Sequence, residues 1–276
     1  MKLRRMTFAG VIGGLALPVL LAVAVGISPP LAVGDAAPQD NTTLFFPLVP
    51  SRLNRYSGLI QQDHPTSYWR LDEVSGTTAT DVQANQDGAY TGGYTLNQPG
   101  ALRSDDDAAV LLNGQDGYVN VPYKANLVTP AFTLEIWAKM ATELGVRQGL
   151  MTLRDNTVGT GVSLDVGASL QPRILMGTGG AGGTDIAFSF GTTITPGQWY
   201  HLVVTFDGTT LREYVNGVQT NAAAASYTPI TSAGGWVIGQ GAAIRPFFWN
   251  GYIDEPAIYN YALGPNQVLN HYVGSQ

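Results

Sequence analysis

Two pairs of adjacent carboxylates and one isolated glutamate are the residues of this sequence that could support acid–base chemistry. Hydrolysis of a glycosidic bond needs an acid and a nucleophile or base about 5–10 Å apart, on either side of one bond. The pairs are Asp72-Glu73 and Asp254-Glu255, and Glu135 stands alone. Adjacent residues of a strand point to opposite faces of a sheet, so neither pair is expected to act together. The sequence therefore disfavours a glycosidase.

The three histidines add no motif for nucleophilic or metal chemistry. His64 precedes a proline, His201 begins an expected strand, and His271 lies in an expected terminal helix. Neither an H-x-x-x-H pair nor a serine-elbow motif surrounds them. We therefore expect histidines that are exposed or hydrogen-bonded within the fold, and we predict that the protein is not an enzyme.

The segment "QWYHLVVTFDGTTLREYVNGVQ" (198–219) shows which elements position these residues. Leu202, Val204 and Phe206 alternate with other residues and share one side of a strand. The dipeptides Asp-Gly at 207–208 and Asn-Gly at 216–217 supply turns with positive φ. The pattern predicts a three-stranded meander that belongs to a larger sheet.

The same pattern continues through the rest of the chain. From Tyr56 onward, short apolar stretches alternate with Gly, Asn, Asp and Pro at intervals of roughly 8–12 residues. This predicts an all-β fold, a sandwich or jelly roll, over residues 56–276. One short C-terminal helix is expected to begin at Pro265. Residues 35–55 are expected to form a linker.

The N-terminus indicates where the protein goes. Three basic residues precede an uncharged run from Met6 to Gly34, which includes Leu15, Leu17, Leu20 and Leu21. About 20 apolar residues are enough to span a bilayer, and a basic start before an apolar stretch is also typical of a secretory signal. Residues 1–34 are therefore either a cleaved signal peptide or a retained membrane anchor. Both alternatives place the remaining chain outside the cytoplasm.

Charge and cysteine content exclude several classes of partner. The chain has a net charge of −6, and residues 35–276 hold all 20 acidic but only 11 of the 14 basic side chains, a net charge of −9. Such a balance repels phosphates, so nucleic acid and anionic lipid are poor partners. The sequence has no cysteine, which excludes disulfides and thiolate chemistry.

Several stretches resemble one family. They are "YSGLIQQDHPTSYWRLDEVSGTTATD", "QPGAL", "LNGQDGYVNVP", "FTLEIWAKM", "PGQWYHLVVTFDGTTLREYVNGVQ" and "NGYIDEPAIYNYAL". In this order they resemble the landmarks of laminin-G-like, concanavalin A-like lectin/glucanase jelly rolls of bacterial surface and secreted proteins, over about residues 56–274. The resemblance implies two antiparallel sheets packed face to face. One departure is Pro256, which implies an edge, a bulge or a lost ladder bond.

The resemblance also implies one structural calcium ion. Domains of this kind often hold calcium with oxygen ligands from the last long strand and an early loop. The matching position is Asp254, with Asp81 or Glu73 as partners. The alternative is that Asp254 only accepts hydrogen bonds from backbone amides at the end of the sheet.

Three consecutive aromatic residues, Phe247, Phe248 and Trp249, stand before an Asn-Gly where the family usually has one. On an extended chain Phe247 and Trp249 share a side and Phe248 takes the other, so at least one ring is expected at the rim of the sheet. Exposed aromatic rings commonly mark a contact surface. Phe247 or Phe248 is therefore expected to contact a ligand or partner. The alternative is that Trp249 is core while both phenylalanines cover the open end of the sandwich.

These observations favour a non-enzymatic, extracytoplasmic binding or adhesion module that recognises a glycan or a protein. The alternative is a structural accessory subunit of a membrane protein complex, held there by its N-terminal helix. A glycoside hydrolase is a distant third, because related hydrolases carry an E-x-D-x-x-E strand and this chain has only the adjacent pairs described above.

Overall fold

The part of the chain that the structure describes consists mainly of two antiparallel sheets. The computed structural model describes residues 55–103, 107–155, 158–179, 185–230, 234–241 and 247–276. Among these residues, no helix is both long enough and apolar enough to cross a membrane. The expected signal or anchor segment, with Leu15, Leu17, Leu20 and Leu21, and the expected linker up to residue 54 lie outside the described residues.

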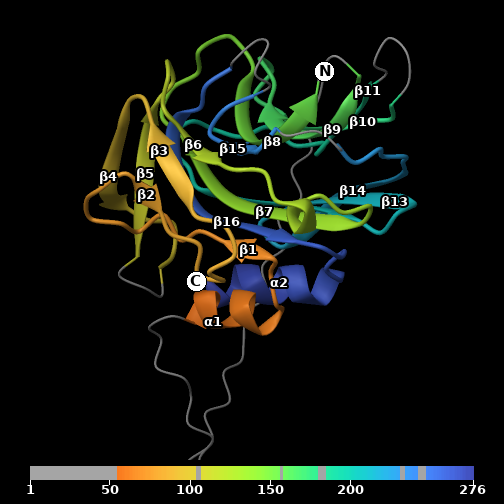
Figure 1. Cartoon of the computed structure of the whole chain (residues 1–276), viewed down its shortest axis with the longest axis horizontal. Coiled ribbons are helices and arrows are strands. Elements are labelled where there is room, and N and C mark those ends of the chain that lie inside the picture. The colour runs from red at the N-terminus through yellow and green to blue at the C-terminus, as the bar shows by residue number, and fades with distance from the viewer. Residues whose placement is uncertain (1–54, 104–106, 156–157, 180–184, 231–233, 242–246) are drawn as a thin grey trace, which may run out of the picture. The chain divides into compact units, whose positions relative to one another are not determined.

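The first sheet contains seven strands in a row and one short strand beside them (Figure 1). The row is β14 (Val218–Ala224), β13 (Thr210–Val215), β12 (Tyr200–Phe206), β7 (Phe132–Met140), β16 (Asn250–Tyr259), β5 (Ala108–Asn113) and β4 (Tyr94–Pro99). The short strand β1 (Ser67–Tyr68) pairs with β16.

The second sheet packs on the first and contains eight strands. Their order is β11 (Asp185–Ser189), β10 (Pro172–Gly177), β9 (Thr160–Val166), β8 (Gln148–Asp155), β15 (Trp236–Ile238), β6 (Tyr118–Val121), β3 (Gly88–Thr91) and β2 (Thr78–Ala79). The other elements are α1 (Arg55–Gln62), α2 (Pro265–Gly274) and the short 3-10 helix η1 (Ala125–Leu127). The predicted jelly-roll sandwich and the helix at Pro265 are confirmed.

The turns predicted at 207–208 and 216–217 connect β12, β13 and β14 as an antiparallel meander. Gly208 and Gly217 both have positive φ, at 99° and 77°, a conformation that glycine adopts without a Cβ clash. β12 continues the sheet by pairing with β7 along its whole length. The meander is therefore part of a larger sheet, as its own marginal stability requires.

Alternating side chains of β7 divide between two apolar clusters, one on each face of the first sheet. Leu134, Ile136 and Ala138 point into the core between the sheets. Trp137 points to the outer face, where it belongs to a second buried cluster with residues of α1 and α2. The two helices lie against the outer face of the first sheet (Figure 1), so its central strand β7 is buried on both faces.

The strand β16 is interrupted by a bulge at Pro256. Its register with β7 shifts between Asp254 and Ala257, and Glu255 has a φ of 56°. Proline has no N–H to donate to a ladder, so the strand accommodates it by leaving the regular pairing. Of the three alternatives that the sequence left open at Pro256, the structure has the bulge.

Glu213 is a charged residue on the inner side of the first sheet. It shares the inward face of β13 with the core residue Leu211 and is fully buried. One oxygen accepts a hydrogen bond from Asn221 Nδ2 at 2.7 Å, and the other has no hydrogen-bond partner among the described residues. Burial raises the pKa of Glu213 to about 7, although the Asn221 amide opposes this.

Replacing Glu213 with Gln should therefore flatten the dependence of stability on pH. A carboxyl whose folded pKa is raised favours the folded state below its unfolded pKa, and this contribution is lost as pH rises through about 7. The wild type should thus lose more free energy of unfolding than Glu213→Gln between pH 5 and pH 8.5, by on the order of 2 kcal/mol. Urea unfolding at several pH values measures this difference. Parallel pH profiles for the two proteins would contradict it.

Candidate functional site

The outer face of the second sheet carries charged side chains in place of an apolar surface. Along β10, Ile174 and Met176 point into the core, so Arg173 points outward by strand alternation. Arg173 lies opposite Asp165 of β9 on one side and Ser189 of β11 on the other. In β9, β10 and β11, the residues that alternate with core residues therefore place polar side chains next to one another on the outer face of the sheet.

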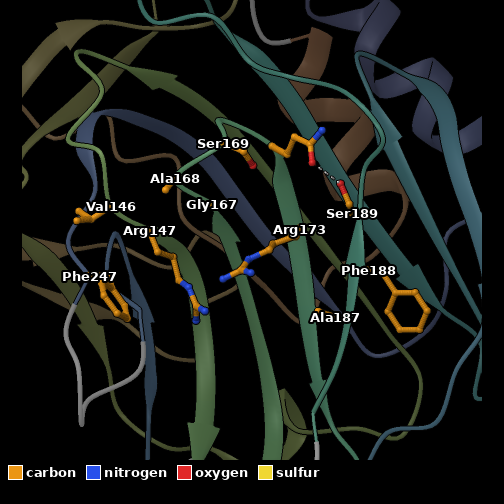
Figure 2. Close-up of a pocket in the computed structure, with 11 residues that line it drawn as sticks. Val146, Arg147, Gly167, Ala168, Ser169, Arg173, Ala187, Phe188, Ser189 and Phe247 are labelled. Carbon is orange, nitrogen blue, oxygen red and sulfur yellow. Dashed lines mark hydrogen bonds between the residues drawn. The ribbon is translucent and has the colours of Figure 1, made fainter.

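A hollow of about 670 Å³ opens on this face at the end of β8, β9 and β10 (Figure 2). The residues that give it chemical character are two arginines, one phenylalanine and two polar side chains: Arg147, Arg173, Phe247, Ser169 and Gln171. The ends of the Arg147 and Arg173 side chains approach one another, and Phe247 lies beside Arg147 (Figure 2). The hollow thus combines cationic donors with exposed ring surface.

A smaller hollow of about 110 Å³ adjoins the first and shares Arg147 and Phe247 with it. It adds Arg154, Asp165 and Asp185 to the lining. The Arg154 guanidinium donates to the Asp185 carboxylate, so these two side chains form an ion pair. Together the two hollows extend over the outer face of four neighbouring strands.

Asp165 is the centre of the charged group. Its side chain is fully buried, and Arg173 Nε donates to its Oδ1 at 2.6 Å. Arg147 Nη1 lies 3.7 Å from its other oxygen. Burial raises the pKa of Asp165, and the hydrogen bond and charge of Arg173 oppose this rise. One buried carboxylate, in the lining of the smaller hollow, therefore orients Arg173 and faces Arg147.

The three aromatic residues singled out in the sequence take different positions. Trp249 is fully buried in the main core. Phe247 is half-buried and lines both hollows, with its ring centroid 5.3 Å from the Arg147 guanidinium carbon. Phe248 is also half-buried, and its ring lies 6.2 Å from that of Tyr118. Of the two phenylalanines expected to contact a ligand, Phe247 is the one that faces the candidate site.

The carboxylates expected to bind calcium do not come together as one group. Asp81 accepts hydrogen bonds from the backbone amides of Tyr68, Gln83, Asn85 and Gln86. Its oxygens therefore organise the loop that follows β2.

Glu73 is used in a similar way to Asp81. It accepts from the backbone amide of Thr80 at 2.7 Å and from the Tyr90 hydroxyl at 2.6 Å. The carboxylates that gather near Asp254 among the described residues are instead Asp107 and Glu255, with ligand atoms within 4.8 Å of one another.

The adjacent residues Asp254 and Glu255 share this group although strand alternation predicts opposite faces. The bulge at Pro256 is the reason, because it breaks the alternation at that point. The expectation that this pair could not come together is therefore wrong in its geometry. Arg70 contacts both Asp107, at 2.6 Å, and Glu255, at 3.2 Å.

Asp254 itself fits an oxygen-coordinated cation. Its side chain is fully buried, and its Oδ2 accepts from the Ala101 amide at 2.7 Å, as the alternative prediction for this residue expects. Its Oδ1 has no hydrogen-bond partner among the described residues. Burial and then the charge of Asp107 raise the pKa of Asp254 well above its usual range. A calcium ion between these two carboxylates would remove that repulsion.

The histidines belong to a buried network that the sequence did not reveal. His201 Nε2 and His271 Nδ1 contact Glu135 at 2.7 Å and 3.1 Å. All three side chains are buried beneath α1 and α2. Because they are closed off from solvent, they form part of the fold. The prediction of hydrogen-bonded histidines holds for these two.

Sequence reasoning also missed the arginines of the hollow. Arg147 and Arg154 are seven residues apart, so regular alternation would place them on opposite faces of β8. The register of β8 with β9 shifts between Gly149 and Met151, and this bulge brings both arginines to the outer face. Arg173, in the alternating segment "PRILMG", was the one member of the group that the sequence pattern could have placed.

Comparisons with solved structures identify the same architecture in proteins of different roles. Domain 4 of the extracellular GH43 arabinanase AbnA of Geobacillus stearothermophilus, solved in complex with arabinotriose, is similar with a TM-score of 0.59 and 22% identity. The match covers 77% of this chain and 98% of that domain. A search of curated protein sequences found no match.

Two further structures are similar over part of their length. The binding domain of Paraclostridial Mosquitocidal Protein 1 has a TM-score of 0.60 and 17% identity, and the match covers 76% of this chain and 52% of that domain. The sialidase of Trypanosoma rangeli, in complex with sialic acid, has a TM-score of 0.56 and 15% identity over 75% of this chain and 32% of the sialidase. At these identities the likeness shows the fold alone.

The sequence itself matches a family model. The match covers residues 113–269, from the end of β5 to α2, which is more than half of the chain. It includes the meander, the bulged strand β16 and the strands that carry Arg147, Arg154 and Arg173. The chain therefore belongs to the concanavalin A-like lectin/glucanase superfamily, within its laminin G group.

Proposed function

We propose that this chain is a non-enzymatic, extracytoplasmic module that binds a glycan on the outer face of its second sheet. The observation that carries the proposal is the hollow of about 670 Å³, lined by Phe247, Arg147 and Arg173. Its volume lies within the range of roughly 300–1,000 Å³ that is usual for ligand sites. A ring beside convergent polar donors is the combination that a sugar requires, because a sugar presents both an apolar face and hydroxyl groups.

The position of this surface supports the proposal. The helices α1 and α2 cover the middle of the outer face of the first sheet, through the cluster that includes Trp137, Tyr214 and Val268. Among the described elements no helix lies on the outer face of the second sheet, where the charged residues are (Figure 1). The second sheet therefore keeps a broad polar face that a ligand can reach.

The names of two similar structures support a binding role. One is a domain in complex with arabinotriose, and another is the binding domain of Paraclostridial Mosquitocidal Protein 1. Within the two hollows, Asp165 is held by Arg173 and Asp185 by Arg154. A glycosidase would need an acid and a nucleophile or base there, and both carboxylates serve the arginines instead.

Replacing Phe247 with Ser should weaken glycan binding, because the ring surface at the hollow is lost. We expect a loss of at least about fivefold in affinity for the glycans that the wild type retains on an array. Phe248→Ser is the matched control, because the same ring is removed from the next position, where it lies near Tyr118. Calorimetric titration with the array ligands measures both variants.

Three results would contradict this proposal. The first is a wild type that retains no glycan. The second is an equal loss of affinity in Phe247→Ser and Phe248→Ser. The third is unaltered affinity in Phe247→Ser while its melting temperature shows that it is folded.

We also propose that calcium binds between Asp254 and Asp107. The support is the approach of Asp107 and Glu255 to the buried Asp254, with ligand atoms within 4.8 Å of one another, and the raised pKa that burial and the charge of Asp107 give Asp254. The chain would supply oxygen ligands from the last long strand, as the resemblance implies. The partner carboxylate would be Asp107 of the segment before β5, in place of Asp81 or Glu73.

Calcium should raise the melting temperature of the wild type and leave that of Asp254→Asn unchanged. At a calcium concentration about 100-fold above the Kd, the expected rise is about 5 °C. Without calcium, Asp254→Asn should be at least as stable as the wild type. An asparagine can still accept from the Ala101 amide and can donate to Asp107, so the repulsion is removed.

Glu73→Gln is the control for the calcium experiment, because Glu73 serves Thr80 and Tyr90 in the structure. This variant should keep the full calcium-dependent rise. Differential scanning fluorimetry after chelator treatment measures all three proteins. Absence of a shift in the wild type, or an equal shift in Asp254→Asn, would refute the proposed site.

A further inference from the structure

Building on the proposed function, we propose that the glycan bound on the second sheet is acidic. Its carboxylate or sulfate group would pair with Arg173 and Arg147 in the larger hollow. The inference rests on how these two guanidinium groups are held, on the charges around them and on the Phe247 ring beside Arg147.

Asp165 holds the Arg173 side chain on one side, and the rest of the guanidinium group faces the larger hollow. Its Nε donates to the buried Asp165 at 2.6 Å, and 26% of its side chain remains exposed. A guanidinium group has five N–H donors, of which this bond uses one. The terminal nitrogens can therefore form the paired bonds that a carboxylate or sulfate accepts. Because Asp165 already orients the group, little side-chain entropy is lost when an anion binds.

Arg147 brings a second cation to the same place. Its Nη1 is 3.7 Å from Asp165, its guanidinium carbon lies 5.3 Å from the centre of the Phe247 ring, and 36% of its side chain is exposed. Figure 2 shows the ends of Arg147 and Arg173 approaching one another. Two guanidinium groups share one carboxylate, Asp165, so this group of three carries a surplus positive charge. An anion seated on both would balance that charge.

The surroundings do not neutralise this surplus. Among the described residues that line the larger hollow, Arg147 and Arg173 are charged and no carboxylate is present. The nearby Arg154 and Asp185 pair with one another. The chain is acidic overall, with a net charge of −6. Exposed charges farther away than about 10 Å are largely screened at physiological salt, so the nearest charges decide what the hollow binds.

The ring of Phe247 indicates that the anion is part of a larger molecule. Phe247 lies beside Arg147 at the hollow, and Ser169 and Gln171 supply uncharged donors and acceptors in the same lining. A free inorganic ion would use only the arginines. A saccharide with an acidic group would use the arginines, the apolar ring surface and the polar side chains together.

The test is a glycan array that carries neutral glycans beside counterparts bearing uronic acid, sialic acid or sulfate on the same backbone. The acidic members should be retained and their neutral counterparts should not. A response restricted to carboxylate-bearing or to sulfate-bearing glycans would assign the anion. Retention should also fall as sodium chloride is raised, because added salt screens a charge-assisted contact.

Arg173→Gln and Arg147→Gln each remove one guanidinium group from the hollow. Both should lower the affinity for the acidic glycan by roughly tenfold or more, because each removes a charge-assisted hydrogen bond. Arg212→Gln is the matched control. It makes the same change of charge on β13 of the first sheet, where Arg212 pairs with Asp207. Melting temperatures show which variants are folded, and Arg173→Lys, which keeps the charge, provides a second substitution at that position.

The outcomes separate this inference from the proposed function. Selective binding of acidic glycans that is lost in Arg173→Gln and Arg147→Gln but kept in Arg212→Gln supports both. Binding that is equal for neutral and acidic counterparts, or that is unaltered in the folded arginine variants, overturns the inference and leaves the glycan-binding function standing. Retention of no glycan at all overturns both.

Discussion

The arrangement of this domain depends on the buried carboxylate of Glu135. Its oxygens accept from the hydroxyls of Tyr56 in α1, at 2.9 Å, and Tyr259 in β16, at 3.3 Å. They also contact His201 of β12 and His271 of α2. Although burial alone would raise it, His271 and His201 hold the pKa of Glu135 well below its usual range. One charged group thus joins both helices to three strands of the first sheet.

The histidine of the terminal helix completes this connection. His271 Nε2 contacts Asp63, just after α1, at 3.0 Å. Burial opposes its protonation, but Glu135 and then Asp63 hold the pKa of His271 above its usual value. A buried charge without such partners would cost several kcal/mol, so α1, α2 and β7 stabilise one another. Because the helices are held on the first sheet, the second sheet keeps the exposed outer face.

Much of the fold follows from local patterns in the sequence. The turn dipeptides at 207–208 and 216–217 set the meander, alternation sets the faces of β7, and Pro265 begins α2. The helix α1 was not expected, because eight residues are too few to show a long helical period and the helix packs through Tyr56 and Ile60.

The candidate site could be predicted less completely from the sequence than the fold, because it is formed by bulges and long-range contacts. The bulge between Gly149 and Met151 brings Arg147 and Arg154 to one face, and the bulge at Pro256 brings Asp254 and Glu255 together. A one-residue shift reverses which face each side chain takes. Pro256 marked the second shift as one of three alternatives, and no local signal marked the first. Phe247 could be predicted because it is an additional aromatic residue just before a strand. Such a feature can be read from the sequence without knowledge of the contacts in the fold.

The most direct test of this account is amide hydrogen exchange with and without the glycan that binds most strongly on the array. When the glycan is bound, exchange should be slower in residues 147–154, 160–166 and 171–177 of the second sheet, since ligand contacts suppress local opening. Exchange in α1 and α2 should not change. Protection confined to α1, α2 and the outer face of the first sheet, with none in the second sheet, would contradict it.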